Sequence, residues 1–238
     1  PVILLARCFL FEKAICFFLT LRPIKINLMD IRVQNLTKQY GPQKAVDNIS
    51  FEVKPGEILG FLGPNGAGKT TTMKMIAQYL EIESGDIIIG GQSVKSNSLK
   101  RHIGYLPESN PLYYEMPVID YLEYVAALQG LPKEKIDHRV REMIKICGLD
   151  VEKHKQISEL SKGYKQRVGL AQAMIHDPEI LILDEPTTGL DPNQIIEIRE
   201  LIKNLGRQKT VLFSTHILPE VEATCDRILI INKGKIVA

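Results

Sequence analysis

The sequence predicts an α/β domain with a parallel sheet and an inserted block of helices. Short apolar runs at 58–62, 180–183 and 211–213 are typical of parallel strands that are buried on both faces. Segments with helical spacing alternate with these runs, and residues 115–149 have helical spacing apart from a break at Gly130-Leu131-Pro132. At about 100–200 residues per domain, a chain of 238 residues has room for one large domain or two small ones.

The expected elements follow from the apolar spacing and the turn residues. Apolar residues alternate with period two at 31–36 and 49–53, as they do in half-buried strands. Pro55-Gly56 marks a turn before the first buried strand, and Gly148 stands just past the end of a helix at 133–147. In order, we expect strands at 31–36, 49–53 and 58–62, a helix from a glycine-rich loop to Leu80, a strand at 86–89, helices at 118–125 and 133–147, a strand at 180–183, a helix at 193–205, and strands at 211–213 and 228–231.

The composition excludes several classes of protein. Thirty Lys and Arg residues against 28 Asp and Glu leave a net charge of +2, which argues against a protein that binds nucleic acid through bulk positive charge. A hydrophobic share of 45% and a charged share of 24% exclude wholesale disorder. The cysteines lack the spacing of a disulfide framework or a zinc site, which favours a reducing compartment. They are Cys8, Cys16, Cys147 and Cys225.

Residues 1–28 differ in character from the rest of the chain. They are mostly apolar and carry a net charge of +3, which leaves −1 for residues 29–238. Arg7 and the Glu12-Lys13 pair interrupt the apolar run, so a transmembrane helix is disfavoured, and a signal peptide lacks its cleavage site. We expect residues 1–28 to be an extension outside the native domain, from an over-extended reading frame whose start is Met29. A membrane-surface segment is the alternative.

Residues 63–70, Gly-Pro-Asn-Gly-Ala-Gly-Lys-Thr, match the phosphate-loop pattern G-x-x-x-x-G-K-[ST] between a buried strand and a helix. The glycines let backbone N–H groups close around phosphate oxygens, and the start of the helix adds the positive end of its dipole. Lys69 can reach the β- and γ-phosphates, and the Thr70 hydroxyl can ligate Mg²⁺. The predicted nucleotide contacts are Gly63, Pro64, Asn65, Gly66, Ala67, Gly68, Lys69, Thr70 and Thr71.

Two carboxylates follow the apolar strand at 180–183. Open α/β sheets bind their ligands at the carboxyl ends of the strands, so both side chains are expected at the site. Asp184 is positioned to hold Mg²⁺, directly or through water, and Glu185 can polarise the attacking water. Together with the phosphate loop, the pair predicts a P-loop NTPase.

Residues 160–167, Leu-Ser-Lys-Gly-Tyr-Lys-Gln-Arg, resemble the signature motif of the ATP-binding subunits of ABC transporters, usually LSGGQ followed by Gln-Arg. The resemblance covers the chain from the end of the apolar extension to the last residue. Lys162 replaces the first glycine of the motif and Tyr164 its glutamine, whereas Ser161 and Gly163 remain. A hydroxyl and an unobstructed backbone N–H at a helix start can both bind a γ-phosphate. By itself, the segment fits a capped amphipathic helix equally well.

The resemblance gives roles to further residues. Tyr40 matches the aromatic position that stacks on adenine, a contact worth about 1–3 kcal/mol. Asp191 matches the D-loop, and His216 matches the switch histidine that contacts the γ-phosphate and holds the catalytic carboxylate. Glu108 stands where the family has the Q-loop glutamine. A carboxylate there can coordinate Mg²⁺ more strongly, but it adds negative charge near the γ-phosphate. The implied catalytic residues are Glu185 and His216, and the implied metal ligands are Thr70, Glu108 and Asp184.

The resemblance also implies an architecture and partners. The fold would be a RecA-like parallel sheet with an N-terminal antiparallel β subdomain and an inserted helical subdomain at about 109–170, within a cassette at 29–238. Two copies would pair head to tail and sandwich ATP between Lys69 of one chain and Ser161 and Gly163 of the other. The dimer would drive a separate integral-membrane permease from the cytoplasmic face of a bacterial inner membrane, with no nucleic acid partner.

Within the family, residues 108–124 resemble bacterial exporters of the drug-resistance and gliding-motility type. Such subunits usually continue into a C-terminal extension, so we expect one beyond Ala238. The alternative function is a soluble, non-transport ABC ATPase of repair or translation. However, no heptads lie between the phosphate loop and the signature, and the chain has one cassette rather than two. A small kinase would not explain His216, and a non-catalytic regulator would lack Glu185 or His216.

Overall fold

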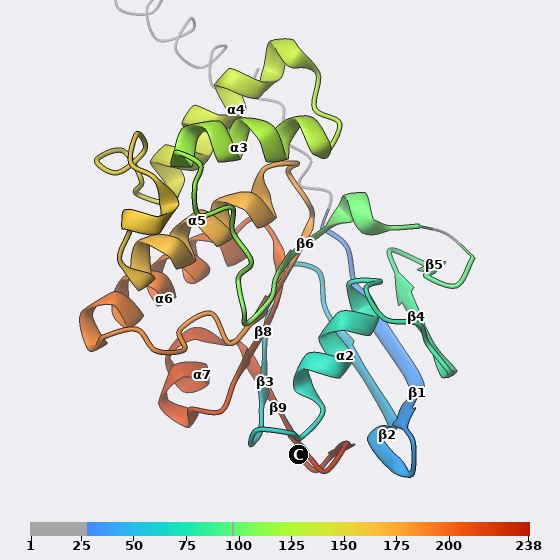
Figure 1. The fold of residues 1–238 in the computed structure, drawn as a ribbon. Coiled ribbons are helices and arrows are strands. Elements are labelled where there is room, and N and C mark those ends of the chain that lie inside the picture. Colours follow the sequence, from blue (N-terminus) through green and yellow to red (C-terminus); the bar gives the residue numbers. More distant parts are fainter. Residues whose placement is uncertain (1–27, 97) are drawn as a thin grey trace, which may run out of the picture.

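The computed structural model describes residues 28–96 and 98–238, and it contains two sheets (Figure 1). A four-stranded antiparallel sheet has the strand order β2-β1-β4-β5, and a six-stranded sheet has the order β10-β9-β3-β8-β7-β6. The predicted apolar extension lies outside the described residues except for Leu28. The strands are β1 (Ile31–Tyr40), β2 (Gln43–Val53), β3 (Ile58–Leu62), β4 (Ser84–Ile89), β5 (Gln92–Ser93), β6 (Ile103–Leu106), β7 (Ile180–Asp184), β8 (Thr210–Thr215), β9 (Arg227–Asn232) and β10 (Lys235–Ile236).

The helices connect the strands of the six-stranded sheet and cover it. The α-helices of the described ranges are α2 (Lys69–Ile76), α3 (Val118–Leu128), α4 (Lys133–Ile146), α5 (Lys162–Met174), α6 (Pro192–Gly206) and α7 (Leu218–Thr224). Two 3-10 turns, η1 (Lys100–His102) and η2 (Ile157–Glu159), complete the order. Helices α3, α4 and α5 all fall between β6 and β7, as expected for an inserted block of helices.

Five strands of the larger sheet, β6, β7, β8, β3 and β9, run parallel, and β10 pairs antiparallel with β9 at the edge. The register places Leu62 opposite Thr215 and Asp184 opposite Ser214. The segments that follow β3, β7 and β8 therefore leave the sheet at the same edge, although they are far apart in the sequence.

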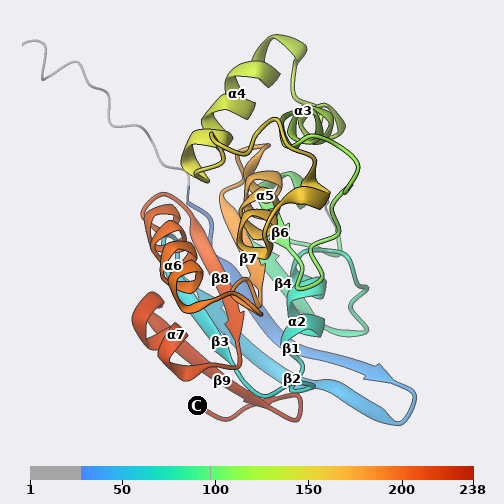
Figure 2. The same cartoon turned by 60° about the vertical axis from the view of Figure 1, so that its left-hand side comes forward.

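Each face of the parallel sheet has its own core. Alternate residues such as Leu183 and Phe213 pack against α3 to α7, whereas Phe61, Ile182 and Leu212 pack against α2 and the antiparallel sheet. Figure 2 shows the helices α6 and α7 on the side of the parallel strands away from the antiparallel ones. The strands are buried on both faces, which explains their unbroken apolar runs.

The predicted α/β class is confirmed, with a parallel sheet and an antiparallel β layer. Several boundaries differ from the prediction. Helix α2 ends at Ile76 instead of Leu80, because Gln78 adopts a left-handed conformation with φ 58° and the N–H of Tyr79 donates to the carbonyl of Lys74 at 2.8 Å. Strands β1 and β2 extend beyond the predicted 31–36 and 49–53.

Strand β6 and helix α7 were not predicted at all. Gly104 interrupts the short apolar pattern of β6, and the fold explains this glycine. A Cβ atom there would lie 2.2 Å from the carbonyl oxygen of Ala173, so α5 could not pack against the strand. Helix α7 has only seven residues and contains Pro219, so its sequence carries little periodic signal.

No helix within residues 28–96 and 98–238 combines the length and the apolar character needed to cross a membrane.

Replacing Phe213 by alanine should lower the free energy of unfolding by about 3–5 kcal/mol, because the ring is fully buried between the sheet and its helices. Ile196 on α6 is 55% exposed, so Ile196→Ala should change that free energy by about 0.5 kcal/mol or less. Urea unfolding followed by circular dichroism measures both variants. Equal losses in the two would contradict the assignment of Phe213 to the core.

Candidate active site

A cavity of about 350 Å³ opens above the loop between β3 and α2. It brings together residues from four separate segments of the chain, and most of them were predicted from the sequence. The lining residues are Tyr40, Gln43, Ala45, Asn65, Gly66, Ala67, Gly68, Lys69, Thr70, Thr71, Glu108 and Glu185. Sequence reasoning missed Gln43 and Ala45, because the start of β2 carries no motif that would indicate contact with a ligand.

The glycines of the loop are required by its backbone conformation. Gly66 has φ 77° and Gly68 has φ 107°, both in the left-handed region that favours glycine. A Cβ atom on Gly68 would also lie 2.4 Å from the carbonyl oxygen of Ala45. Gly68 caps α2 and lines the cavity, so the positive end of this helix faces the cavity, an arrangement that favours an anion.

Lys69 is the buried cation of the cavity, with 5% of its side chain exposed. Its ammonium donates to the carbonyl oxygens of Gly63 at 2.7 Å and Pro64 at 3.2 Å. It also lies 3.3 Å from Oε1 of Glu185, whose side chain is equally buried. The carbonyl groups of Gly63 and Pro64 therefore hold the ammonium of Lys69 in place. Gly63 and Pro64 do not themselves line the cavity.

Asp184 lies at the end of β7 and is fully buried. Burial raises the pKa of this carboxyl above its ordinary value, while the nearby hydroxyls of Ser214 and Thr70 act in the opposite direction. The Ser214 hydroxyl donates to Oδ1 at 2.6 Å. Among the described residues, Oδ2 is buried with no hydrogen-bond partner. A buried carboxylate oxygen beside the Thr70 hydroxyl has the donor chemistry that Mg²⁺ requires, so the residues present fit this metal.

Glu185 is held in a strained conformation. Its φ of 51° is uncommon for a residue with a side chain, and such strain is often found at functional sites. Its N–H donates to the hydroxyl oxygen of Ser214 at 2.9 Å. Nδ1 of His216 lies 2.9 Å from Oε2, which is the predicted contact between the switch histidine and the carboxylate. An ionised carboxylate can only accept, so this contact is a hydrogen bond in the tautomer that carries its proton on Nδ1.

Two further predicted residues lie at the rim. Tyr40 ends β1 and is 51% exposed, so one face of its ring is available for stacking. The ammonium of Lys38 lies 5.7 Å from the centre of this ring. Glu108 lines the cavity two residues after β6.

Ser161, Gly163 and Asp191 do not line this cavity, and they gather at a second place on the same chain. Ser161 and Asp191 cap α5 and α6, and each accepts a hydrogen bond from a backbone N–H of the helix that it begins. The two helix starts touch, because a Cβ atom on Gly163 would lie 2.7 Å from the Gln194 side chain. The Gln194 side chain thus leaves no room for a side chain at Gly163.

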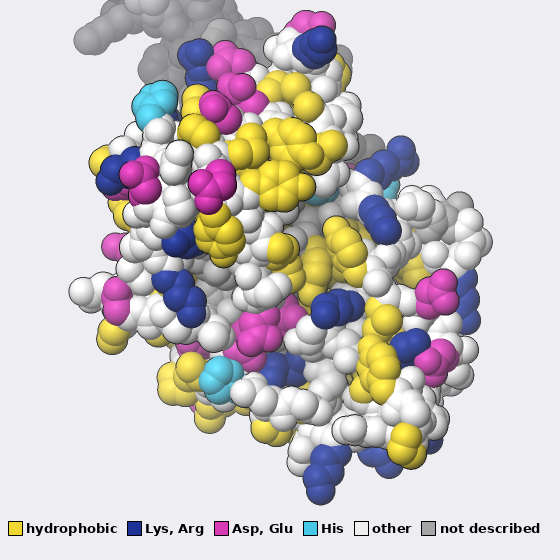
Figure 3. Space-filling view, in the orientation of Figure 1, with side chains coloured by type: hydrophobic (Ala, Val, Ile, Leu, Met, Phe, Trp, Pro, Cys, Tyr) yellow, Lys and Arg dark blue, Asp and Glu magenta, His cyan; other side chains and the backbone are white. Residues whose placement is uncertain are grey.

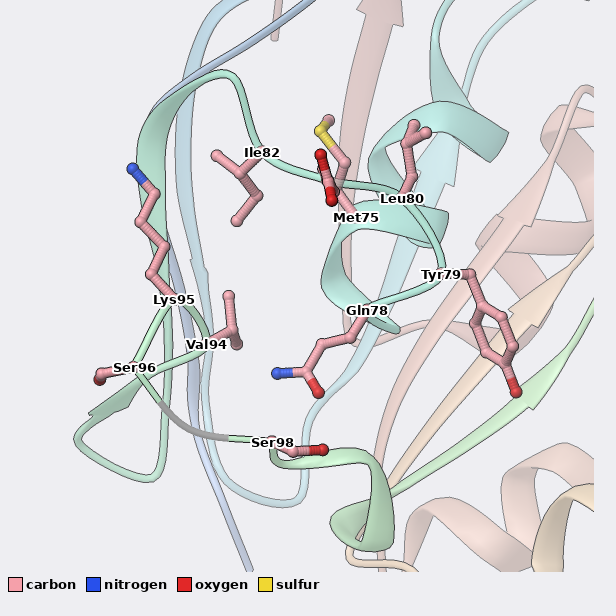
Figure 4. Close-up of a pocket in the computed structure, with 10 residues that line it drawn as sticks. Met75, Gln78, Tyr79, Leu80, Ile82, Val94, Lys95, Ser96 and Ser98 are labelled. Carbon is pink, nitrogen blue, oxygen red and sulfur yellow. The ribbon is translucent and has the colours of Figure 1, made fainter.

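A larger cavity of about 560 Å³ lies beyond the carboxyl end of α2 (Figure 4). Tyr79 and Leu80 line one side, and Ile82, Val94 and Lys95 line the other. None of the predicted site residues contributes to it, so it is separate from the candidate active site.

The phosphate loop, the two carboxylates and the parallel sheet define a P-loop NTPase. The family model described as ABC transporter matches residues 46–188, which is more than half of the chain. The chain therefore belongs to the ABC transporter family, as an ATPase cassette.

Known relatives agree with this assignment. An uncharacterized ABC transporter ATP-binding protein of Bacillus subtilis, YhcH, is 42% identical over 87% of this chain and 68% of its own length. The bacitracin transport ATP-binding protein BcrA of Bacillus licheniformis is also 42% identical, over 87% and 68%. A bacterial ABC transporter cassette solved as a dimer superposes with a TM-score of 0.80, at 25% identity over 87% of this chain and 97% of the other.

Replacing Asp184 by asparagine should stabilise the protein at neutral pH when Mg²⁺ and nucleotide are left out. The folded-state pKa of this carboxyl is raised, so its ionised form costs folding free energy at every pH above the raised value. The cost fades as the pH falls through that value and is gone below the ordinary pKa of 3.8. The gain in melting temperature should therefore shrink as the pH is lowered.

Asp150→Asn is the matched control, because the Asp150 side chain is 65% exposed and its replacement should leave the melting temperature nearly unchanged. Thermal unfolding at several pH values measures both variants. A lower melting temperature for Asp184→Asn at neutral pH would contradict the assigned cost of this buried charge.

Proposed function

We propose that this chain binds Mg·ATP in the cavity above residues 63–70, hydrolyses it as half of a head-to-tail dimer, and thereby drives export through a separate membrane permease. The observation that carries the proposal is the division of the site into two parts. The phosphate loop, Asp184, Glu185 and His216 form one part, and Ser161, Gly163 and Asp191 form the other.

The first part has the groups needed to hold ATP and activate water. Lys69 would exchange its contact with Glu185 for the β- and γ-phosphates, which frees Oε1 to accept a proton from water. His216 holds Oε2 and thereby fixes the orientation of the carboxylate. Tyr40 would stack on the adenine at the rim.

Thr70, Asp184 and Glu108 would hold Mg²⁺ beside the phosphates. When bound, the metal supplies positive charge that neutralises the phosphate oxygens. Buried Oδ2 of Asp184 supports this assignment most directly, because it has no hydrogen-bond partner among the described residues. Glu108 would bring a further negative charge to a metal that already faces a triphosphate, which distinguishes this chain from relatives with glutamine there.

The second part supports the dimer. Ser161 and Asp191 stand at the starts of two helices, where backbone N–H groups favour an anion, yet neither lines the cavity with Lys69. A second copy in the opposite orientation would bring this surface over the ATP of its partner. ATP would then stabilise the dimer by the difference in its affinity for the closed and open states.

An exposed apolar surface supports the membrane partner. Tyr113 (54% exposed), Tyr114 (46%), Tyr124 (40%) and Leu128 (67%) lie on α3 and on the segment that leads to it from Glu108. Figure 3 shows hydrophobic side chains gathered over this part of the molecule. The rings of Tyr113 and Tyr124 lie 5.6 Å apart. We propose that a permease subunit covers this surface and senses the nucleotide through Glu108.

The proposed subgroup is the drug exporter. The relative BcrA, named for bacitracin transport, supports export of this kind, whereas the gliding-motility likeness stays a prediction.

The proposed location is the cytoplasmic face of the inner membrane, and the proposed cassette comprises 29–238 with a helical subdomain at about 109–170. The relatives reported above carry transporter names, so the alternative of a soluble, non-transport ATPase is not favoured.

Replacing Glu185 by glutamine should lower ATP turnover by about 10²–10⁴-fold, because the amide cannot accept the proton of water. ATP binding should persist, and size-exclusion chromatography with ATP should show a trapped dimer. Lys69→Ala is the contrasting variant, because it should lose affinity in a titration with a fluorescent ATP analogue. A Glu185→Gln protein that hydrolyses ATP at the normal rate would refute Glu185 as the base.

A photo-crosslinking amino acid in place of Tyr124 should form an adduct with a multi-spanning membrane protein in cells that express the intact chain. The same amino acid in place of Ile196, an exposed residue on α6, is the control and should form no such adduct. Mass spectrometry of the purified adduct identifies the permease. Adducts at both positions, or with soluble proteins alone, would contradict the proposed surface.

A further inference from the structure

Glu220, on α7, is a buried carboxylate that the proposed mechanism does not use. Only 3% of the residue is exposed. Its Oε2 accepts hydrogen bonds from the hydroxyls of Thr187 at 2.8 Å and Thr215 at 2.6 Å. Among the described residues, Oε1 has no hydrogen-bond partner. A glutamate is rarely buried in this way, since loss of hydration is costly, so its two contacts call for an explanation.

The first contact fixes the turn that carries His216. Thr215 ends β8, and its hydroxyl donates its proton to Glu220, so a lone pair is left for the N–H of Ile217 at 3.1 Å. The backbone is thus held on both sides of His216. The His216 side chain is itself 41% exposed, and apart from its contact with Glu185 this turn is what orients it.

The second contact fixes the turn that follows Glu185. Thr187 lies between the catalytic carboxylate and the segment that leads to Asp191. Its carbonyl accepts a hydrogen bond from Leu190 at 3.2 Å, and the N–H of Thr188 donates to the carbonyl of Glu185 at 3.1 Å. Glu220 therefore joins two turns that come from different strands and carry the two partners of one hydrogen bond.

We propose that Glu220 is a positioning residue for ATP hydrolysis, which holds His216 against Glu185 and links both to the segment that leads to Asp191. The inference rests on the proposed function. Glu220 touches neither nucleotide nor water in this scheme and acts through Thr215 and Thr187. Because Asp191 belongs to the part of the site that faces the second copy, the same carboxylate couples the two parts of the site within one chain.

The test compares Glu220→Leu, which removes the acceptor of both hydrogen bonds, with Glu220→Gln, whose amide oxygen can still accept both threonine hydroxyls. Glu220→Leu should lower kcat by up to about 10²-fold, with KM and ATP affinity changed little, because a small displacement of a catalytic group can cost that much. Glu220→Gln should retain most of the activity. Glu222→Leu is the matched control, since Glu222 is exposed on the same helix and should tolerate the change.

A double variant separates positioning from simple structural support. If Glu220 acts through His216, Glu220→Leu should cause no further loss of kcat in a His216→Ala background. An equal loss of kcat in both backgrounds would overturn the proposal, and so would a normal kcat for Glu220→Leu. If Glu220→Leu does not fold, the Thr187→Val and Thr215→Val variants replace it, with the same expected dependence on His216.

The proposed function is tested separately in the same assay. If Glu185→Gln abolishes turnover but Glu220→Leu does not reduce it, only the role of Glu220 fails. If neither the unaltered chain nor any variant shows turnover that depends on Glu185, the proposed hydrolysis fails as well.

Discussion

The parallel register of β3, β8 and β7 is the constraint on which the rest of the site depends. It sets Leu62 opposite Thr215 and Asp184 opposite Ser214, so three chain segments leave the sheet at one edge. The phosphate loop, the carboxylates and His216 follow these strand ends directly. A shift of one residue would move each buried side chain to the other face of the sheet and would separate these groups, so core packing protects the site.

The polar contacts at this edge form one continuous network. The hydroxyl of Ser214 donates to Asp184 and accepts the N–H of Glu185, which holds the glutamate in its left-handed conformation. Glu185 in turn contacts Lys69 and His216. Buried charges of this kind are costly, and the raised pKa of Asp184 reports one such cost. The protein gives up some stability at this edge and gains a preorganised site.

In the proposed function, the separation of the site into two parts makes a single chain incomplete. In the proposed mechanism the first part holds phosphate and activates water, whereas Ser161 and Asp191 do not line its cavity. Function then depends on how a second copy is brought into place and on how each part senses the other. Glu220 is placed to couple the two parts of the site, because it joins the turn of His216 to the turn that leads towards Asp191.

The sequence by itself determined strands β3, β7, β8 and β9 of the larger sheet, the phosphate loop, the two carboxylates and the family, because these features depend on local patterns with fixed spacing. Tertiary structure decided the rest. Strand β6 was not predicted from the sequence, because Gly104 interrupts its apolar pattern. A glycine is required there so that α5 can pack against the strand. Gln43, Ser214, Thr187 and Glu220 carry no local signal, since their roles arise only when distant segments meet at the strand ends. The contact of His216 with Glu185 was implied by the family likeness, but its 2.9 Å geometry depends on the register that buries the sheet.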